Sequence, residues 1–488
     1  MNTKLLKQKI LDLAIRGKLT QQLKSDGTAA DLLKQISEQK RESSSTLSSP
    51  RRRGSPSAQS EKTIISLDKN EAPFEIPANW EWVRLGNVCK VFGRIGFRGY
   101  TKKDLVEKGE GAISLSPSNM DEMKLNFDKC TYISWFKYEE SPEIMINKGD
   151  IIVVKTGSSY GKTSIVQDLP EKTTLNPQLM VLKQINCNRN YLCYFLNSAY
   201  FRKVFEELVN GTAIPTFSQE KFSSKEFPLP PLAEQQRIVE KIQEAFAEID
   251  SIENNKELLK THIKQTRQKI LDLAIHGKLV PQNKSDEPAS VLLERITRDN
   301  PHYEKIEDEP FEIPQNWVWC RLRNLSESIQ YGYNAPAKDS GRIKMVRISD
   351  IHENEVEWDS VPYCDIDNKE IQTYLLKKND ILFARTGGTV GKSFIVSNLP
   401  EDAVYAGYLI RTRYGKNANA QYMKYFMESN LYWEQLRDGC IATAQPNCNG
   451  KTLGKMQIPL PPLNEQSRIV AKIEELFSTL DQMERNLV

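Results

Sequence analysis

Two short glycine loops contain the residues that come closest to a nucleotide-binding motif. The first reads KTGSSYGKTSIV at 155–166 and follows the apolar run DIIVV. A phosphate-binding P-loop has four residues between its first glycine and the closing Gly-Lys-Ser/Thr, so that enough backbone N–H groups surround the phosphates. Here only three residues separate Gly157 from Gly161, and the loop RTGGTVGKSFIV at 385–396 has the same short spacing. The same deviation in both loops favours a repeated structural element over a triphosphate site.

The rest of the chain offers little for catalysis or metal binding. It has four histidines, and none of them belongs to an H-E-x-x-H motif. NPQL at 176–179 lacks the second proline and the aromatic residue of the loop found in adenine methyltransferases, and FGRIGF at 92–97 does not fit G-x-G-x-x-G. The eight cysteines form no C-x-x-C pair, which indicates scattered thiols in a reducing cytosol. We therefore expect no metal site and no catalytic residue in this chain.

The composition is typical of a soluble globular protein with two or three domains. Of its 488 residues, 39% are hydrophobic and 27% are charged. The net charge of +3 is too small to indicate nucleic-acid binding by itself, although it is compatible with local basic patches. No run of about 18 apolar residues could span a membrane, and the N-terminus lacks the apolar core of a signal peptide. We expect a cytoplasmic protein.

Internal repeats indicate that the chain is a duplication. Four blocks recur in the same order, namely QKILDLAIRGKL (8–19 and 268–279), FEIPANWEWVRLGNV (74–88 and 311–325), the glycine loop, and PLPPLAEQQRIVEKIQEAF (228–246 and 459–477). They return about 260, 237, 230 and 231 residues later. Most of the change in offset corresponds to a Ser/Arg-rich stretch at 43–60, whose composition predicts a flexible linker.

A long helix is expected between the two copies. From Glu234 to Leu279 there is no proline, and there is no glycine before Gly277. Nine of eleven positions spaced alternately by four and three are apolar, as in a coiled-coil seam. These positions are Ile238, Ile242, Ala245, Ile249, Ile252, Lys256, Leu259, Ile263, Thr266, Ile270 and Leu273. A helix of about 43 residues would be roughly 65 Å long at 1.5 Å per residue.

The two chain ends repeat the two halves of this helix. The C-terminus repeats the first half, and the N-terminus repeats the second. Aligned on the central copy, Val488 falls at position 257 and Met1 at position 261, so about three residues are missing between them. We therefore expect the terminal helices to meet and rebuild a second long helix. It would pack antiparallel to the central one about a pseudo-twofold axis.

Two lobes of mixed secondary structure are expected between the helices. Each contains β-branched strand runs, glycine and proline turns, and short helical stretches. The predicted fold class is α+β, with two α/β lobes separated by a pair of long antiparallel coiled-coil helices and a pseudo-twofold internal repeat. The expected segments are an N-terminal helix (1–20), a flexible linker (21–69), the first lobe (70–232), the central helix (233–279), a second linker (280–307), the second lobe (308–463) and a C-terminal helix (464–488).

Two related lobes on a rigid rod suit a target with two sites at a fixed spacing, and duplex DNA is such a target. The lobes differ most outside the repeated blocks, as expected if a common scaffold positions loops that read different base edges. Two corresponding loops, at 92–103 and 329–342, combine cations, aromatic residues and glycine. The candidate DNA contacts in them are Arg94, Arg98, Tyr100, Lys102, Lys103, Tyr331, Tyr333, Asn334, Lys338 and Arg342.

The glycine loops fit a DNA target as well. Lys155 and Arg385 occupy equivalent places, as do Lys162 and Lys392. A cation beside glycine N–H groups can hold a single phosphate of a DNA backbone without a triphosphate cage. We therefore predict that these four residues contact DNA, with a tight turn as the alternative role of the glycines. Two other classes of protein stay open, a nuclease or NTPase that uses the Gly-Lys-Thr/Ser loops and a scaffold without a DNA role.

The repeated blocks resemble the specificity (S, or HsdS) subunit of Type I restriction–modification systems. The resemblance rests on P-L-P-P-L-x-E-Q-x-R-I-V-x-K-I, I-L-D-L-A-I-x-G-K-L, F-E-I-P-x-N-W-x-W and T-G-x-x-x-G-K, each present twice and in the family's order over nearly the whole chain. It implies two target recognition domains, each reading half of a split DNA sequence, with the helices setting the spacer. The Ser/Arg-rich stretch at 43–60 departs from the compact family pattern.

The resemblance also implies that the chemistry belongs to partner subunits. Two modification (M) subunits would methylate adenine with S-adenosylmethionine, and two ATP-dependent restriction (R) subunits would complete the nuclease. S-adenosylmethionine, ATP and Mg are therefore expected on those partners, and no cofactor is expected in this chain.

The resemblance further implies that the modification subunits dock on the repeated helical blocks. Apolar residues on more than one face of these helices suit a partner helix, although contact with the protein's own lobes is the alternative. The candidate partner-binding residues are Glu234, Gln235, Ile238, Ile270, Leu271, Glu465, Gln466 and Ile469.

Overall fold

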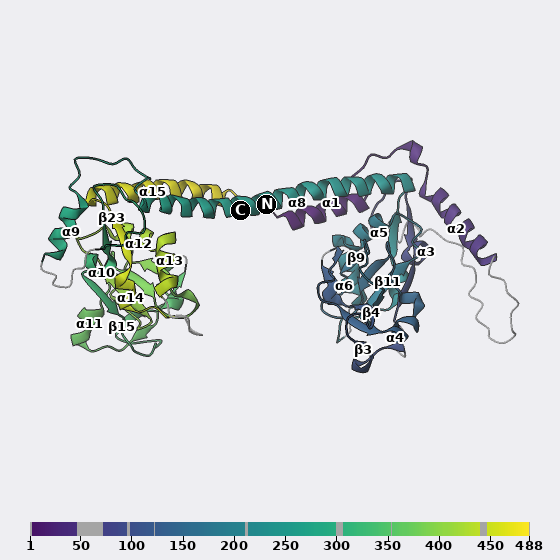
Figure 1. The fold of residues 1–488 in the computed structure, drawn as a ribbon. Coiled ribbons are helices and arrows are strands. Elements are labelled where there is room, and N and C mark those ends of the chain that lie inside the picture. Colours follow the sequence, from purple (N-terminus) through teal and green to yellow (C-terminus); the bar gives the residue numbers. More distant parts are fainter. Residues whose placement is uncertain are drawn as a thin grey trace. The chain divides into compact units, whose positions relative to one another are not determined.

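The chain folds as two units. The computed structural model describes residues 2–45, 72–94, 98–121, 123–209, 213–298, 306–352, 354–439 and 447–487. Its two compact units are Met1–Asn254 (unit 1) and Asn255–Val488 (unit 2). Each unit contains one lobe of strands and short helices together with a pair of longer helices (Figure 1). The boundary falls inside the predicted central helix, as expected from the way the repeats are distributed.

Two four-stranded sheets form the lobe of unit 1. The first has the antiparallel order β2 (Lys90–Gly93), β11 (Leu179–Lys183), β8 (Ile151–Val154) and β9 (Thr163–Ile165). The second has the order β10 (Thr173–Leu175), β4 (Gly111–Leu115), β7 (Thr131–Ser134) and β3 (Leu105–Val106), with β10 and β4 parallel. Two strand pairs complete the lobe, β1 (Glu81–Arg84) with β12 (Glu226–Leu229) and β5 (Met120–Asp121) with β6 (Lys124–Leu125).

The lobe of unit 2 repeats this topology. Its first sheet has the antiparallel order β14 (Ser328–Tyr331), β22 (Leu409–Arg413), β19 (Ile381–Ala384) and β20 (Ser393–Ile395). Its second sheet has the order β18 (Tyr363–Cys364), β15 (Ile343–Val346) and β21 (Ala403–Tyr405), with β15 and β21 parallel. The pairs are β13 (Val318–Arg321) with β23 (Gln457–Leu460) and β16 (Ile351–His352) with β17 (Glu355–Val356).

Short helices pack against the sheets of each lobe. In unit 1 they are α3 (Leu85–Val88), α4 (Trp135–Glu139), α5 (Arg189–Leu196), α6 (Ala199–Val209) and α7 (Gln219–Ser223). In unit 2 they are α10 (Leu322–Leu325), α11 (Asn368–Tyr374), α12 (Ala420–Phe426), α13 (Asn430–Gly439) and α14 (Gly450–Lys455). The 3-10 turns are η1 (Lys24–Asp26), η4 (Lys102–Asp104), η5 (Pro117–Asn119), η6 (Pro142–Ile144), η7 (Ile348–Asp350) and η8 (Gly387–Thr389).

The apolar run of β8 explains how the layers of unit 1 pack. Successive side chains of a strand point to opposite faces of the sheet. Ile151 and Val153 therefore join the core under α5 and α6, while Ile152 and Val154 join the core between the two sheets. A strand that is buried on both faces reads as a continuous hydrophobic run. β19 repeats this division between the two corresponding cores of unit 2.

Helix α8 (Leu232–Ile275) is one continuous helix of 44 residues, which confirms the predicted long helix. In unit 1, α1 (Thr3–Ile15) runs antiparallel to it, because Thr3 bonds Glu253 whereas Thr20, farther along the chain, bonds Glu234. In unit 2, α15 (Leu463–Arg485) runs antiparallel to the second part of α8, and Arg267 bonds Glu484 at 2.9 Å. The predicted antiparallel pairing is therefore present within each unit.

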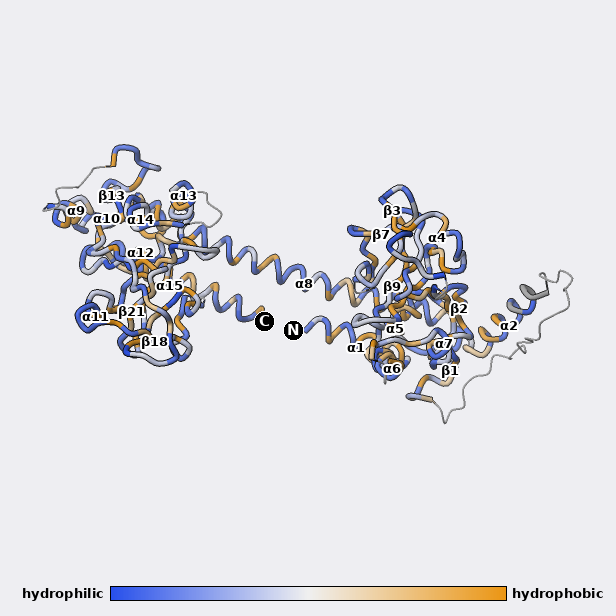
Figure 2. The backbone as a smooth tube through the Cα atoms, turned by 90° about the horizontal axis from the view of Figure 1, so that it is seen from below, coloured by the Kyte–Doolittle hydropathy of each residue, from blue (hydrophilic) through white to orange (hydrophobic). Residues whose placement is uncertain are grey.

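Five of the eleven predicted seam positions are buried, whereas Ile252 and Leu259 near its middle are 49% and 41% exposed. Ile238, Ile242 and Ile249 are buried in unit 1, and Ile263 and Ile270 are buried in unit 2. Hydrophobic and hydrophilic stretches alternate along α8 accordingly (Figure 2). Met1 and Val488 lie outside the described residues, so the meeting of the two chain ends stays a prediction.

The predicted linker at 21–69 is wrong over its first part. Helix α2 (Ala29–Ser45) lies there, and its residues Ala29, Leu33 and Ile36 belong to the core of unit 1. The predicted linker at 280–307 likewise contains α9 (Ala289–Thr297), with Ala289, Leu292 and Leu293 in the core of unit 2. The spacing of the apolar residues in ADLLKQI and SVLLERI is typical of a helix with one buried face. Residues 46–71, including most of the Ser/Arg-rich stretch, lie outside the described residues.

The described residues contain neither a membrane-spanning helix nor a metal-binding cluster. No helix there combines the length and the hydropathy that are needed to cross a bilayer. Within the same ranges, no group of three or more His, Cys, Asp or Glu side chains is arranged to hold a metal ion.

Candidate nucleic-acid interface

The Glu-Gln pair at the start of α8 forms a buried joint between the helix and its lobe. Glu234 is fully buried and accepts hydrogen bonds from Trp80 Nε1 at 2.8 Å and Gln22 Nε2 at 2.6 Å. Gln235 Oε1 accepts from the backbone N–H of Asn188 at 2.7 Å, which is the N-cap residue of α5. The joint therefore connects α8 to the segment after α1, to the Trp80 segment and to a lobe helix.

Unit 2 builds the same joint with fewer hydrogen bonds. Gln466 accepts from the backbone N–H of Asn419 at 2.8 Å, which caps α12 in the same way. Glu465 Oε1 accepts from Gln282 Nε2 at 2.6 Å, but Oε2 is buried without a hydrogen bond of good geometry. Val280 stands where unit 1 has a threonine. Burial raises the pKa of Glu465, and the nearby Trp317, Gln282 and Arg468 side chains offset this only in part.

An ion pair completes each joint. Arg237 binds Asp26 through two hydrogen bonds of 2.7 and 2.6 Å, and Arg468 binds Asp286 at 2.7 Å. Both aspartate side chains are almost fully buried. The hydrogen bond from the arginine is the main reason why the pKa values of Asp26 and Asp286 are lowered.

These placements contradict the predicted partner-binding role of the repeated helical residues. Six of them are 0% exposed, namely Glu234, Gln235, Ile238, Glu465, Gln466 and Ile469. The other two, Ile270 and Leu271, are 8% and 4% exposed. A side chain without accessible surface cannot contact a partner. The alternative prediction, contact with the protein's own lobes, is the one that the structure supports.

Other apolar residues of the long helices are exposed at equivalent positions in both copies. Leu232 and Leu463 are 53% and 41% exposed, and Ile252 and Met483 are each 49% exposed. Each pair is separated by 231 residues, the offset of the last repeated block. Ile252 was predicted as part of the seam, and the other three were not among the candidate partner-binding residues, although each pair recurs at the repeat offset.

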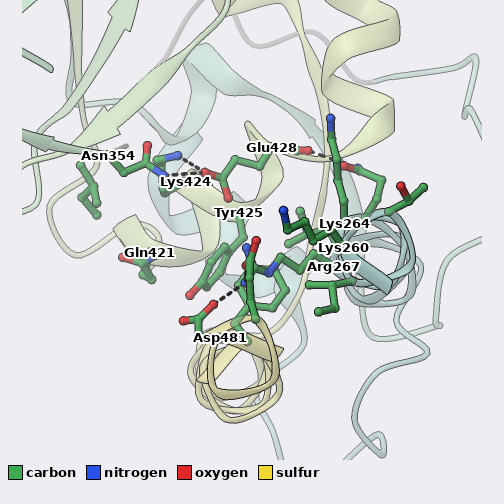
Figure 3. A pocket seen from close by; sticks show the side chains of 16 residues that line it. Lys260, Lys264, Arg267, Asn354, Gln421, Lys424, Tyr425, Glu428 and Asp481 are labelled. Atoms are coloured by element: carbon green, nitrogen blue, oxygen red, sulfur yellow. Dashed lines mark hydrogen bonds and ion pairs between the residues drawn. The ribbon is translucent and has the colours of Figure 1, made fainter. Parts of the chain in front are cut away.

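A groove of about 820 Å³ lies beside the helix pair of unit 2, between α8, α12 and α15 (Figure 3). Lys260, Lys264 and Arg267 of α8 line it together with Tyr425 of α12. Tyr425 packs edge-on against Phe477 at 5.8 Å, and Gln268 Nε2 donates to Glu428 O at 3.2 Å.

Contacts in unit 1 repeat those that build this groove. Gln8 Nε2 donates to Asn197 O at 3.2 Å, and Tyr194 packs edge-on against Phe246 at 5.9 Å. The surface beside each helix pair is therefore built in the same way in both units.

The glycine loop of unit 1 is held on two sides by backbone hydrogen bonds. The Lys155 N–H donates to Gln178 O at 2.9 Å, next to the first residue of β11. The Lys155 carbonyl accepts from the Phe217 N–H at 3.2 Å, and Thr156 forms a β-bridge with Thr216. The start of the loop is thus clamped between two other segments of the lobe.

The loop of unit 2 has the same clamp. The Arg385 N–H donates to Tyr408 O at 3.2 Å, and its carbonyl accepts from the Cys448 N–H at 2.9 Å. Thr386 forms a β-bridge with Asn447. Two loops with different side chains are therefore fixed by the same backbone contacts.

The glycines of both loops serve the turn. Gly161 and Gly391 have φ values of +80° and +92°, which residues with a side chain rarely adopt. A Cβ atom at either position would also collide with a lobe helix, since it would meet Phe205 at 2.7 Å or Leu436 at 2.2 Å. This supports the tight-turn role for these glycines.

The cations of the two loops have different surroundings. Lys155 is half-buried, has no ion pair with any described residue, and has a pKa lowered by burial. Arg385 lies 4.8 Å over the Tyr331 ring, and its Nε is buried without a hydrogen-bond partner. Lys162 Nζ donates to Met120 O at 3.2 Å, whereas Lys392 is exposed. Lys155, Arg385 and Lys392 thus remain available to a ligand at the loop.

The family model described as "Type I restriction modification DNA specificity domain" matches residues 77–261 and 314–487. The chain belongs to this family. It is a specificity subunit of type I restriction–modification systems, which confirms the resemblance seen in the repeated blocks. Nothing in the comparisons supports the NTPase alternative.

Relatives of this specificity subunit match over almost its whole length. The specificity subunits of the Escherichia coli enzymes EcoAI and EcoEI are each 25% identical to it, over 98% and 99% of this chain and 90% of theirs. The crystal structure of the HsdS subunit from Thermoanaerobacter tengcongensis aligns with a TM-score of 0.53 at 19% identity, covering 86% of this chain and 94% of that one. This likeness confirms the predicted fold class of two α/β lobes and long helices.

The candidate DNA contacts predicted in the loop at 92–103 of unit 1 fall into two groups. Arg94 is only 4% exposed, because its guanidinium donates to Leu175 O at 3.0 Å and to the hydroxyl of Thr174 at 3.3 Å. Burial also lowers the Arg94 pKa. The prediction that Arg94 contacts DNA therefore conflicts with its place inside the lobe.

The neighbouring residues are more accessible. Arg98 pairs with Glu143 at 3.4 Å, and the Tyr100 hydroxyl accepts from Ser114 at 2.9 Å. Lys102 and Lys103 are exposed on η4. Residues 95–97 of the predicted reading loop lie outside the described residues.

The predicted reading residues of unit 2 lie mostly at the surface. Asn334 and Arg342 are exposed, and the exposed Lys338 pairs with Asp365 at 2.6 Å. Tyr333 is partly buried against Tyr374, with ring centroids 5.2 Å apart.

The structure adds two residues that the specificity subunit could use to read DNA. Tyr408 is 65% exposed, and Gln178, its counterpart in unit 1, is exposed as well. Each precedes the strand that pairs with β2 or β14. Sequence analysis missed both, because only the clamp shows that they lie beside the glycine loop.

Proposed function

We propose that each unit of this specificity subunit reads one half of a bipartite, asymmetric DNA site. The supporting observation is the clamp that holds both glycine loops by the same backbone contacts while their side chains differ. A common scaffold with different side chains is what recognition of two different base sequences requires, because base edges carry the sequence information.

Exposed cations on both lobes would supply attraction to the DNA backbone. Lys102 and Lys103 in unit 1, and Arg342 and Lys392 in unit 2, are exposed and form no ion pair with a described residue. Contacts of this kind add affinity that depends on salt concentration but carries no sequence information. They would position the duplex on each lobe.

The helix pairs would hold two copies of the modification subunit. The exposed apolar positions occur in both copies, as do the contacts beside the groove. A partner that binds twice needs the same surface twice. In this proposal the modification subunits methylate adenine with S-adenosylmethionine, two restriction subunits cleave DNA with ATP and Mg, and this chain has no catalytic activity. The complex would work in the cytoplasm, where it meets DNA.

The continuous helix α8 would set the length of the spacer between the half-sites. A helix is the stiffest connection that a single chain can build between two lobes, with a rise of about 1.5 Å per residue.

Mapping methylated adenines across the genome tests this proposal. Cells carrying the chain and its partner subunits should methylate one split sequence that is unmethylated without the chain. Lys155→Ala should alter one half of that sequence and spare the other. A motif without a spacer, or equal loss at both halves, would contradict independent reading by the two units.

A further inference from the structure

Three equivalent positions meet beside the clamped start of the glycine loop in each unit. In unit 2 they hold Tyr331, Arg385 and Tyr408, which we name the reading triplet of unit 2. The register places Tyr331 opposite Ile410 of β22, two residues after Tyr408, and the Arg385 N–H donates to Tyr408 O. Strands β14, β19 and β22 are neighbours in one sheet, so the sheet fixes the three positions relative to one another.

The reading triplet of unit 1 is Gly93, Lys155 and Gln178. Gly93 is opposite Met180 of β11, again two residues after the exposed member, and the Lys155 N–H donates to Gln178 O. The backbone is therefore equivalent at all three positions, while all three side chains differ between the units.

The space beside the first position is filled in two alternative ways. In unit 1, a Cβ atom on Gly93 would lie 2.7 Å from the Gln219 side chain. The Gln219 amide, oriented so that both hydrogen bonds form, donates to Val91 O at 3.2 Å and accepts from the Gly93 N–H at 3.0 Å. In unit 2, Gly450 stands at the position of Gln219, and its N–H donates to the Tyr331 hydroxyl at 2.9 Å. Unit 1 thus has Gly93 beside Gln219, whereas unit 2 has Tyr331 beside Gly450 at the same two positions.

This exchange gives Arg385 an aromatic platform. Its guanidinium lies 4.8 Å over the Tyr331 ring, which is anchored through its hydroxyl. An arginine stacked in this way loses less freedom when it binds, and it presents a planar fork of N–H donors. No described residue pairs with the guanidinium, and its buried Nε lacks a partner. A buried donor without an acceptor costs free energy, so a ligand that supplies an acceptor to Nε would be stabilised at this site.

A guanine edge fits these donors better than a phosphate does. Guanine presents two acceptors, N7 and O6, to a bidentate arginine in the major groove. A phosphate contact needs no aromatic platform and no exposed tyrosine beside it, and the exposed Lys392 of the same loop could already provide one.

We propose that Arg385, held over the Tyr331 ring, reads a guanine in the half-site of unit 2, and that Tyr408 contacts the neighbouring base. Lys155 and Gln178 occupy the same positions for the half-site of unit 1. This inference rests on the proposed DNA-reading function. It adds which residues read each half-site and names guanine as one of the bases.

The test uses the full chain assembled with its modification subunits and maps methylated adenines in cells. Arg385→Lys keeps the charge but removes the planar set of N–H donors. We expect the methylated motif to accept other bases at one guanine position of one half-site. Discrimination at that position should fall at least about tenfold. The spacer and the half-site that Lys155→Ala alters should stay as in the wild type.

A double substitution tests the role of the Tyr331 ring separately from that of Arg385. Tyr331→Gly combined with Gly450→Gln gives unit 2 the packing found in unit 1, and we expect the same relaxed guanine position with Arg385 intact. Assembly of each variant with the modification subunits, measured by size-exclusion chromatography, confirms that it is folded.

Three results would overturn the inference. They are a half-site of unit 2 that contains no guanine, an Arg385→Lys motif identical to the wild type, and methylation that falls uniformly while the motif stays unchanged, as for a phosphate contact. Each of them leaves a split motif and so spares the proposed function. A wild-type motif that is not split would instead reject the proposed function itself.

Discussion

Glu234 and Glu465 occupy equivalent positions in the two units, but the protein stabilises their ionised side chains to different extents. Glu234 accepts hydrogen bonds from Thr20, Gln22, Asn79 and Trp80. Glu465 accepts one hydrogen bond of good geometry, from Gln282, and its buried second oxygen has only a poorly aligned contact with Trp317. The ionised form is therefore better solvated by the protein in unit 1 than in unit 2.

The first prediction compares Glu465→Gln with Glu234→Gln. Because burial raises the pKa of Glu465 above its ordinary value of 4.5, unit 2 should lose stability as pH rises from below 4.5 through the raised pKa. Glu465→Gln should remove this loss and cost little at neutral pH. Glu234→Gln should destabilise unit 1 by about 1.5–3 kcal/mol, because the glutamine NH₂ group faces donors. Urea unfolding of the full chain at several pH values measures both effects, and an equal cost at both sites would contradict the prediction.

The second prediction concerns Lys155 in the clamped loop. Burial lowers its pKa below the ordinary 10.5, so the charged form is disfavoured in the folded state at neutral pH. Lys155→Met should therefore leave the melting temperature equal to or above that of the wild type while it weakens DNA binding. The exposed Lys34→Met, outside the candidate DNA contacts, is the matched control for loss of a surface charge. A clear fall in melting temperature with Lys155→Met would show that the lysine has a structural role.

At the scale of elements, helices α2 and α9 belong to the cores of their units. Both follow a long-helix segment, and the N–H of their first residue bonds the Asn before a core tryptophan, from Ala29 to Asn79 and from Ala289 to Asn316, at 2.9 Å each. Each helix therefore connects its long helix to the N-W-x-W segment of its lobe.

The third prediction tests these helices as structural elements. Leu33→Ala in α2 and Leu293→Ala in α9 remove equivalent buried side chains, which are 8% and 3% exposed. Each should cost its own unit about 2–5 kcal/mol of unfolding free energy. The exposed Lys34→Ala is the control, with an expected change within about 0.5 kcal/mol. Chemical denaturation is the measurement, and a wild-type midpoint for both leucine variants would place α2 and α9 outside the cores.

At the scale of the whole molecule, the chain is a duplication whose units share a helix. Both units use the same order in the first sheet, the same joint and the same clamp, and they differ in the side chains at the reading positions. If α8 sets the spacer, the spacer length and the DNA sequence read by each lobe are independent properties.

The fourth prediction separates these two properties. Insertion of four residues next to Asn255 in α8 adds about one helical turn, or about 6 Å. We expect the methylated motif to keep both half-sites and to gain a longer spacer. Genome-wide methylation mapping with the partner subunits measures this, with Asn255→Ala as the control for a change without added length. An unchanged spacer would reject α8 as the element that sets it.

The repeated blocks and the apolar periodicity already indicated the duplication, the long helix, the two lobes and the family. These features depend on local periodicity and on blocks that recur along the chain, and both can be read without coordinates. The residues of the joint were also visible as repeats, since Glu234 and Gln235 return as Glu465 and Gln466.

The direction in which those side chains point depends on how the helices pack against the lobes. Helical spacing cannot tell whether a repeated polar residue faces a partner or the protein's own lobe, and here Glu234 and Gln235 face the interior. Arg94 was predicted to contact DNA but donates to Leu175 O in the interior, and Arg385 lies over the ring of Tyr331, which belongs to β14. Such contacts join residues far apart in sequence, and the register that creates them is set by the packing of the whole lobe.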